Sequence, residues 1–467
     1  MPSTSFGFTP QRRELSPFPT EANDVSRQHA NTLLILTSAL LKTPFSVVYA
    51  LLFPFCFKEL NLSYGEIAFL TMVQALGMCL GSYWSLIATR SSSHIPSYFL
   101  WSHVGARLPW FIMWFHPSKE SLGVVLFLYN FLHHGSFPAW IETLKTLYPP
   151  TPRNNVASWS LAISQCVCVS MAFLFHWFPL EPLQGRTTVF FHLVLCCASL
   201  DLIALGLQYV LMLWAIRIKP LSPTQGQDQR QGQQQNQKHD REQPDIQLNE
   251  LWQIIQPTTS FFKFQVRFMF FGIAVVLFKP IQSVFLASLS HCSYSQMVFF
   301  LSVCRGVGGM ISARAWGALL NSSSVRLMSS CLFFLSLCST LLLLCVQMCA
   351  QMYQSGMFLL LTLAFTLQGA SNTASSMLWV VSGPLFAHQD ETLSPQKHGS
   401  RPYNAMNLLL SGIRGCFAPP LGQWIAISLG VGGVLWTVAL MYFLACVTFA
   451  RDEKNRVSVF AQKTQNL

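Results

Sequence analysis

Residues 225–237 read QGQDQRQGQQQNQ and lie near the middle of a chain of 467 residues. Such a polar tract cannot bury enough apolar surface to offset the entropy of ordering it, so we predict a solvated linker over 217–258. A Gln-rich tract can also self-associate, but a tether is the plainer interpretation of this composition. The linker separates two long apolar parts, 31–216 and 259–450, and this division decides the fold.

Both parts have the composition of a membrane protein. Hydrophobic residues make up 52% of the chain and charged residues only 10%, whereas soluble proteins are about a quarter charged. A membrane span needs roughly 20 apolar residues in a helix, because every backbone polar group must be paired inside the hydrocarbon. Twelve runs meet this requirement, and they lie at 31–56, 66–88, 96–116, 121–147, 156–178, 188–216, 261–288, 294–319, 326–348, 355–386, 402–427 and 429–450. We therefore predict an all-α integral membrane protein with twelve transmembrane helices in two six-helix bundles.

The distribution of Lys and Arg predicts the orientation. The tails at 1–30 and 451–467, the linker and the loops on their side hold most of the basic residues, while the opposite loops hold Lys58, Lys119 and Arg186. By the positive-inside rule, both tails and the linker are cytoplasmic, in a bacterial inner membrane or a plasma membrane. The net charge of +11 follows from this asymmetry, so it gives no reason to expect a nucleic-acid partner.

The two apolar parts repeat each other. Residues 42–50 read KTPFSVVYA, and residues 279–287 read KPIQSVFLA, so that a Lys and a Pro are followed in both by Ser-Val and, three residues later, by Ala. The next runs begin similarly, with Tyr-Gly-Glu-Ile-Ala-Phe at 64–69 and Tyr-Ser-Gln-Met-Val-Phe at 294–299. The matches keep the same order along the chain, which favours two parallel halves of a duplicated transporter fold.

With six spans on each side of a hydrophilic cytoplasmic loop, the chain resembles the major facilitator superfamily over essentially its whole length. Gly317 through Asn321, followed by Arg326, is similar to the family's Gly-x-x-x-Asp and basic loop motif, with Asn where Asp is usual. Gly412 and Gly415 resemble the family's helix-packing glycines in the eleventh span. The resemblance implies alternating-access transport and a central cavity bordered by the first, seventh, eighth and eleventh helices, but it does not identify a subfamily.

Charged residues inside the spans are the candidate functional groups, because each costs about 2.5 to 3.5 kcal/mol at the centre of a bilayer. Five cations but only one comparably central acid, Asp201, lie in the runs. We expect Asp201 to pair with Arg107, since the third and sixth helices flank each other in the resembled fold. The remaining cations, with two amides of the tenth run, form the predicted substrate-binding set: Lys42, Lys279, Arg305, Arg414, Gln368 and Asn372.

Each residue type has an expected role in this set. The planar guanidinium groups of Arg305 and Arg414 suit the clamping of an anionic substrate, and the titratable Lys42 and Lys279 suit binding or coupling. A structural alternative is that the two lysines bond to backbone carbonyls freed by the prolines that follow them. Unpaired basic groups in a cavity attract anions, so we expect an organic or phosphorylated anion as substrate.

A second set is expected in coupling or ion pairing, namely Arg107, Asp201, Glu142 and His134. Glu142 and Lys145 lie one turn apart and can pair. His133 and His134 point about 100° apart on a helix, so they do not readily bind one metal, although one of them can face the cavity and titrate. We expect no metal site and no cofactor.

These observations favour a secondary active transporter. We expect its partners to be a small molecule, which the excess of central cations predicts to be anionic, a coupling ion or exchanged solute, and the lipid bilayer. The sequence has no phosphate-binding Gly-Lys-Ser/Thr motif, which excludes ATP hydrolysis by such a loop as the energy source. Its acidic residues are few and dispersed, which argues against an enzyme. The alternatives are an exporter of drugs or hydrophobic solutes and a transporter-like receptor that moves no solute.

Overall fold

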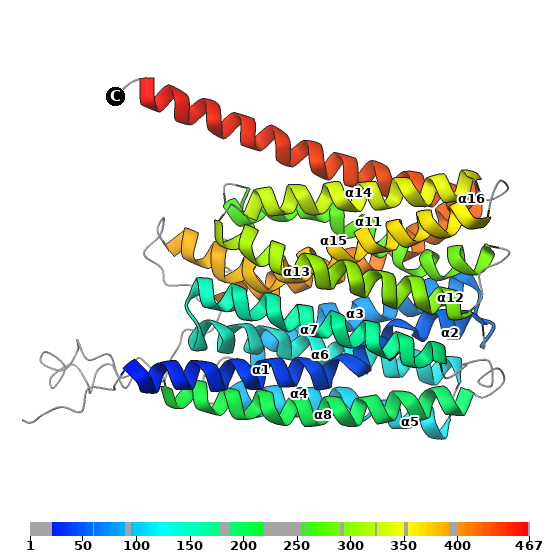
Figure 1. The fold of residues 1–467 in the computed structure, drawn as a ribbon, viewed down its shortest axis with the longest axis horizontal. Coiled ribbons are helices and arrows are strands. Elements are labelled where there is room, and N and C mark those ends of the chain that lie inside the picture. Colours follow the sequence, from blue (N-terminus) through cyan, green and yellow to red (C-terminus); the bar gives the residue numbers. More distant parts are fainter. Residues whose placement is uncertain are drawn as a thin grey trace, which may run out of the picture.

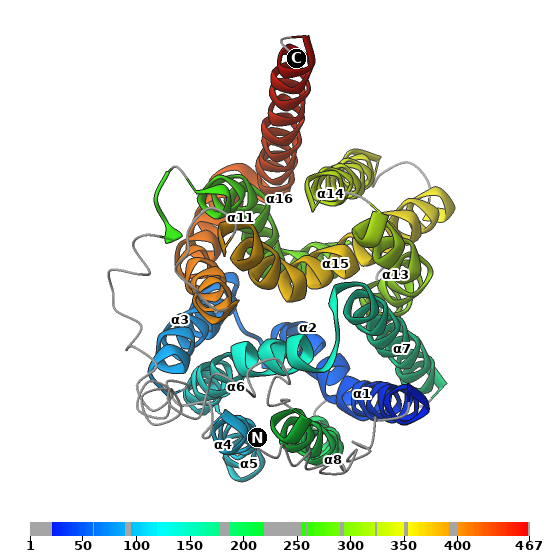
Figure 2. The same ribbon diagram turned by 90° about the vertical axis from the view of Figure 1, so that its left-hand side faces the viewer.

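The computed structural model describes residues 21–58, 60–88, 95–116, 118–177, 187–218, 254–257, 259–289, 294–322, 325–349, 354–391 and 400–465. The described part contains helices and no strand. Figure 1 shows most of the helices running side by side along one direction, and Figure 2 shows them end on, with the first half of the chain on one side and the second half on the other. Most of the predicted linker lies outside the described residues.

The first half supplies six crossings. The first and third apolar runs are each divided into two helices, and the third breaks at Pro109, where a proline cannot donate a backbone hydrogen bond. The six runs of this half form the helices α1 (Glu21–Ala50), α2 (Leu52–Lys58), α3 (Tyr64–Ala88), α4 (Ile95–Arg107), α5 (Trp110–Phe115), α6 (Lys119–Leu147), α7 (Pro150–Trp177) and α8 (Thr187–Ile218).

The second half supplies six more. The eighth run contains a π-helical segment, η4 (Phe299–Cys304), directly before Arg305. The eleventh and twelfth runs lie within one element, α16 (Ser400–Gln465), which changes direction at Gly430, where φ is 71°. Glycine adopts this left-handed conformation without steric cost. The other elements are α11 (Ser260–Ser288), α12 (Tyr294–Val298), α13 (Arg305–Ser322), α14 (Val325–Cys349) and α15 (Gln354–Glu391).

Length and composition agree with an integral multi-pass membrane protein. In the described part, nine helices are long and apolar enough to cross a bilayer, and one of them, Pro402–Phe449, has 48 residues. At about 1.5 Å per residue, that helix is more than twice as long as the roughly 30 Å of hydrocarbon, so it holds two spans joined at Gly430. The remaining two crossings, α4 with α5 and α6, carry polar side chains such as Arg107 and His133.

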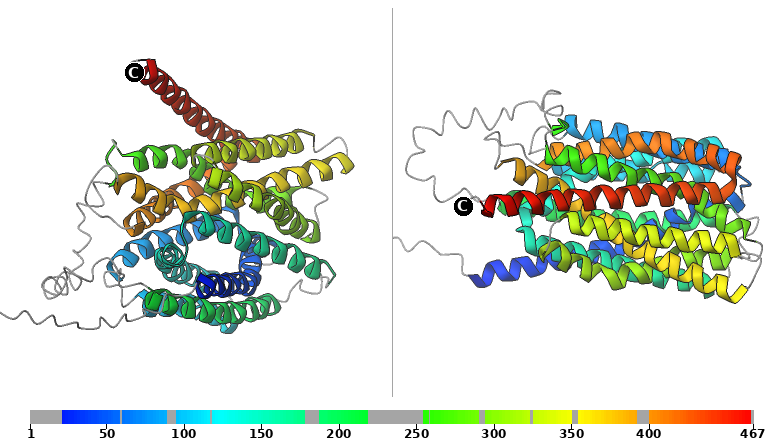
Figure 3. Two further views of the ribbon diagram at one scale, coloured as in Figure 1. Left: turned by 60° about the vertical axis from the view of Figure 1, so that its left-hand side comes forward. Right: turned by 90° about the horizontal axis from the view of Figure 1, so that it is seen from above.

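The helices extend beyond the first and last predicted spans. Helix α1 begins at Glu21, ten residues before the first predicted span, and α16 continues to Gln465 instead of ending near 450. Figure 3 shows the last part of α16 running past the bundle as one long helix. Hydrophobicity marks where a helix crosses the hydrocarbon, but a helix can continue beyond it because its backbone hydrogen bonds are internal.

The two halves meet along two seams lined with small residues. Helix α3 packs on α16, and α7 packs on α13. A Cβ atom added at Gly412 of α16 would lie 2.5 Å from the Cβ of Cys79 in α3, and one added at Gly309 of α13 would lie 2.8 Å from the Cγ of Gln165 in α7. Glycine therefore allows the backbones to approach closely, as is common where membrane helices pack.

An amide contact joins the halves at the end of the α7–α13 seam. The Nδ2 of Asn154 donates to the Oδ1 of Asn321 at 2.9 Å, and the Nδ2 of Asn321 donates to the Oδ1 of Asn155 at 2.9 Å. Asn321 is the residue that stands where the resembled motif usually has Asp. In this chain the contact between the halves at that position is made by uncharged groups.

Candidate substrate cavities

A cavity of about 700 Å³ lies between the two halves. Helices α1, α3, α4, α6, α7 and α8 of the first half line it together with α15 and α16 of the second half. Its residues on α7 fall in the first turns of that helix, and those on α15 fall in its second half, so the cavity lies toward the end of the bundle that carries the linker. This volume is within the range of about 300 to 1,000 Å³ that is typical of small-molecule sites.

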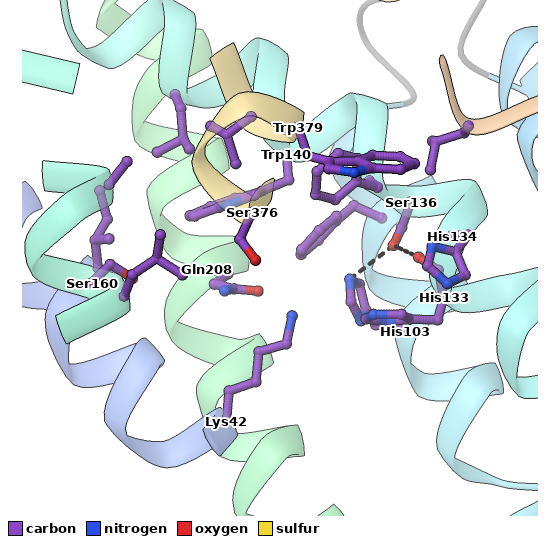
Figure 4. Close-up of a pocket in the computed structure, with 18 of the residues that line it drawn as sticks. Lys42, His103, His133, His134, Ser136, Trp140, Ser160, Gln208, Ser376 and Trp379 are labelled. Atoms are coloured by element: carbon purple, nitrogen blue, oxygen red, sulfur yellow. Dashed lines mark hydrogen bonds between the residues drawn. The ribbon is translucent and has the colours of Figure 1, made fainter. Parts of the chain in front are cut away.

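Lys42 projects into this larger cavity from α1. Its side chain is half-buried, and Figure 4 shows its ammonium group directed into the space between Gln208 and His103. Trp140 and Trp379 form an aromatic wall across from it, from α6 and α15 respectively. The described lining contains no Asp or Glu. The larger cavity thus combines an apolar wall with a cation that no carboxylate in the described lining neutralises.

Three histidines gather at one side of the larger cavity (Figure 4). The Nε2 of His103 lies 2.8 Å from the Oγ of Ser136, and that hydroxyl donates to the backbone carbonyl of His133 at 2.7 Å. The ring centroid of His133 lies 5.1 Å from that of His103 and 5.3 Å from that of His134. The arrangement is a cluster of imidazole rings on α4 and α6 that borders the cavity.

A smaller cavity of about 170 Å³ lies within the second half. It contains two cations, Lys279 of α11, whose side chain is exposed, and Arg305 of α13, and its described lining has no Asp or Glu. Asn372 of α15 lines both cavities and therefore marks where they adjoin. The other polar side chains around the smaller cavity are those of Gln282, Ser336, Ser339, Thr340, Gln368, Ser371 and Tyr442.

Neutral amides hold the guanidinium of Arg305. Its Nε and Nη2 donate to the Oε1 of Gln368 at 3.1 and 2.8 Å, and its Nη2 also donates to the Oε1 of Gln282. The two glutamines are joined because the Nε2 of Gln282 donates to the Oε1 of Gln368 at 2.8 Å. The face of Phe365 lies 5.3 Å from the guanidinium carbon. These contacts orient Arg305 without cancelling its charge.

Arg107 and Asp201 form a buried ion pair between α4 and α8. The Nε of Arg107 donates to the Oδ2 of Asp201 at 2.6 Å, and the residues are only 2% and 4% exposed. The guanidinium also lies over the rings of Phe45 and Tyr129, at 4.9 and 5.1 Å. The structure therefore contains the pairing that the sequence favoured, and neither residue lines the two cavities.

Arg414 does not line either cavity, which differs from its predicted position in a substrate clamp. It is 6% exposed, and its Nε and Nη1 have no hydrogen-bond partner among the described atoms. The guanidinium lies against Gly272 and near the rings of Phe268 and Trp379, at 5.6 and 5.9 Å. The sequence placed Arg414 near the middle of the eleventh run, but the rotation of α16 about its axis directs the side chain toward Gly272, Phe268 and Trp379.

Three of the other predicted site residues line a cavity, and one has a side chain outside the described residues. His134 and Asn372 line the larger cavity, and Gln368 lines the smaller one. The side chain of Glu142 lies outside the described residues, so its pairing with Lys145 stays a prediction. Among the described residues, no group of three His, Cys, Asp or Glu side chains could hold a metal ion.

Several residues of the cavities were missed by sequence reasoning. His103 and Gln208 are polar residues in apolar runs, which was an available signal. Gln282 lies one turn after Lys279 in the repeated segment, where a polar residue is equally unusual. The two tryptophans of the aromatic wall gave no signal, because a Trp in an apolar run can as easily face lipid.

The described helices superpose on solved transporter structures. Nucleoside transporter NupG matches with a TM-score of 0.58 and 12% identity, over 90% of this chain and 98% of that chain. The proton:xylose symporter XylE of the major facilitator superfamily, bound to 6-bromo-6-deoxy-D-glucose, matches with a TM-score of 0.60 and 13% identity, over 92% of this chain and 96% of that chain. No protein-family model matches the sequence, and no curated protein does. The chain has the fold of the major facilitator transporters.

Proposed function

We propose that this chain is a secondary active transporter that moves a small organic anion across a membrane by alternating access. Two observations support transport, namely the fold and the presence of a cavity between the halves, where transporters built from repeats bind their solutes. NupG and XylE transport a nucleoside and xylose, so the fold accepts small polar solutes. Charge is the feature that favours an anion in this chain.

The observation that carries the proposal is the charge of the cavity walls. Lys42, Lys279 and Arg305 line the two adjoining cavities, and no carboxylate belongs to their described lining. Cations that are close together in a medium of low dielectric repel each other, and a bound anion relieves that repulsion. Each charge-assisted hydrogen bond to the anion would contribute about 1.5 to 3 kcal/mol.

The shape of the two cavities suggests how the solute lies. In our proposal, the anionic group enters the smaller cavity, where Arg305 and Lys279 bind it. Asn372 contacts the solute where the cavities adjoin, and the body of the solute lies in the larger cavity along Trp140 and Trp379. Aromatic side chains favour a flat apolar body, since stacked rings gain contact area and a favourable electrostatic geometry.

Movement between the two access states would occur along the seams between the halves. The glycines of α13 and α16 leave little side-chain bulk at these seams, so the halves can shift against each other. Substrate binding selects between the states by contacting one more strongly than the other. The charge asymmetry of the loops supports cytoplasmic tails, with the larger cavity then nearer the cytoplasm.

A hydrophobic-solute exporter is the second candidate function. The aromatic wall of the larger cavity favours it, because apolar surface alone can bind a hydrophobic solute. That function would leave the cations of the smaller cavity without a role. A receptor that moves no solute differs from both in showing no uptake.

The test compares each anion with an uncharged compound of nearly the same shape. Purified protein is mixed with benzenesulfonate or benzenesulfonamide, and with uridine monophosphate or uridine, and thermal unfolding is measured. Binding at 100 times the dissociation constant stabilises the folded protein by about 2.7 kcal/mol. In at least one of these two pairs of compounds, we expect the anion to raise the unfolding temperature of the protein more than its uncharged counterpart does. Vesicles containing the protein should also take up that anion. Preference for the uncharged member would overturn the anion proposal and favour the exporter.

A further inference from the structure

The larger cavity contains titratable groups that the proposed anion site does not use. A gradient-driven transporter needs a group that gains and loses the coupling ion in each cycle. No carboxylate is present in the described lining, but His103, His133 and His134 are. We propose that His134 binds a coupling proton and that the chain is an anion:proton symporter. This inference rests on the proposed function and adds the ion that drives it.

Contacts of the cluster distinguish His134 from its two neighbours. The single hydroxyl hydrogen of Ser136 is donated to the carbonyl of His133, so Ser136 accepts a hydrogen bond from the Nε2 of His103. The ring of His133 is stacked on that of Tyr129 at 5.2 Å, and its Nδ1 is buried without a partner among the described atoms. His103 is therefore committed to a structural bond, and His133 is packed among aromatic rings.

His134 lines the larger cavity together with Lys42. Burial of its ring is the main factor that opposes a positive charge on it, and the charges of Lys279, in the smaller cavity, and of Lys42 add to that effect. The wider surroundings of the cluster hold the charges of Arg107 on α4 and Asp201 on α8, which neutralise each other as an ion pair. Helices α3, α7, α15 and α16 contribute no Asp, Glu, Lys, Arg or His to the described lining.

This placement makes anion binding and proton binding cooperative. In the empty protein, two ammonium groups oppose a third positive charge on His134. An anion bound by Lys279 and Arg305 in the smaller cavity cancels part of that repulsion and attracts a proton to the imidazole. Coupling between two binding sites is reciprocal, so a proton on His134 strengthens anion binding by the same factor. Release of either ligand on the other side of the membrane then promotes release of the other.

The charge balance gives a further consequence. One proton and one monovalent anion cross together, so no net charge moves in a transport cycle. A pH gradient would then drive accumulation, whereas a membrane potential alone would not.

The first experiment counts protons taken up on binding. Benzenesulfonate is titrated into the purified full-length protein by calorimetry, at one pH near neutrality and in buffers with different heats of ionisation. Benzenesulfonate does not itself titrate in this range, so the dependence of the heat on the buffer measures protons bound by the protein. We expect proton uptake by the wild type and by His116→Gln, whose side chain is exposed at the end of α5 away from the cavities, and none by His134→Gln.

The second experiment separates coupling from transport. In vesicles loaded with unlabelled benzenesulfonate, exchange with labelled benzenesulfonate needs no net proton movement. We expect His134→Gln to retain exchange and to lose accumulation driven by an imposed pH gradient, which the wild type and His116→Gln should both show.

Outcomes distinguish this inference from the function on which it rests. Binding or exchange in the wild type without proton uptake would overturn the inference alone. Loss of proton uptake in His103→Gln but not in His134→Gln would also overturn it, because the proton would then be elsewhere in the cluster. Failure of the wild type to bind or exchange benzenesulfonate would count against the anion proposal itself, and the inference would fail with it.

Discussion

Arg414 lies beside an aromatic ring of the larger cavity: the indole of Trp379 lines the cavity, and the guanidinium carbon of Arg414 lies 5.9 Å from the centroid of that ring. In the proposed transporter, the arginine would act on a solute through the position of Trp379. Its Nε and Nη1 have no hydrogen-bond partner among the described atoms, so its charge is costly to the fold.

The first prediction separates the stability of the fold from transport at this position. Arg414→Met removes the uncompensated charge and keeps most of the side-chain volume, so we expect a higher unfolding temperature. It also removes the cation that lies over Trp379, so anion uptake should fall by at least several-fold. Circular dichroism on heating and vesicle uptake measure the two effects. A lower unfolding temperature with normal uptake would show that Arg414 serves packing alone.

The second prediction concerns Arg305, the arginine that lines the smaller cavity. Arg305→Gln should weaken anion uptake tenfold or more, since about 1.4 kcal/mol of lost binding free energy already gives tenfold. The glutamine can still bond to Gln282 and Gln368, so folding should persist. Arg314→Gln is the matched control, because Arg314 is an exposed residue of the same helix that lines neither of the two adjoining cavities. Equal uptake by the two variants would contradict the anion site.

The third prediction tests whether the pair of Arg107 and Asp201 holds the fold or couples transport. Asp201→Asn leaves a buried guanidinium without its carboxylate, and breaking such a pair costs about 3 to 5 kcal/mol. The double variant Arg107→Met, Asp201→Leu removes both charges and should recover most of the lost stability. If it also recovers uptake, the pair is structural. Stability without uptake would instead assign the pair a part in the transport cycle.

The fourth prediction is topological and follows from the basic loops. A protease site inserted within 225–243 should be cut from the cytoplasmic side of sealed vesicles, together with tags at both ends of the chain. Cleavage of the linker from the opposite side, with the tags still cytoplasmic, would contradict an even number of crossings in the first half. Immunoblotting of the fragments reads out either result.

The sequence predicted the fold because apolar runs mark the helices that cross a bilayer and the repeat marks the two halves. It also indicated that Lys42, Lys279 and Arg305 line a cavity, since a charge deep in an apolar run has to face a cavity or a partner. It did not determine how far each helix is rotated about its axis, which is why Arg414 was expected in the cavity. It also gave no sign of η4, because a π-helical turn depends on packing that no local pattern of residues specifies.

The amide contact of Asn321 with Asn154 and Asn155 differs from a carboxylate contact in its response to salt and pH. Carboxylate latches respond to ionic strength, because salt screens exposed charges, and they weaken when the acid is protonated. Amides carry no net charge and do not titrate near neutrality. This contact between the halves is therefore insensitive to salt concentration and to pH near neutrality. In the proposed transport cycle, any response to pH would therefore come from groups other than this contact.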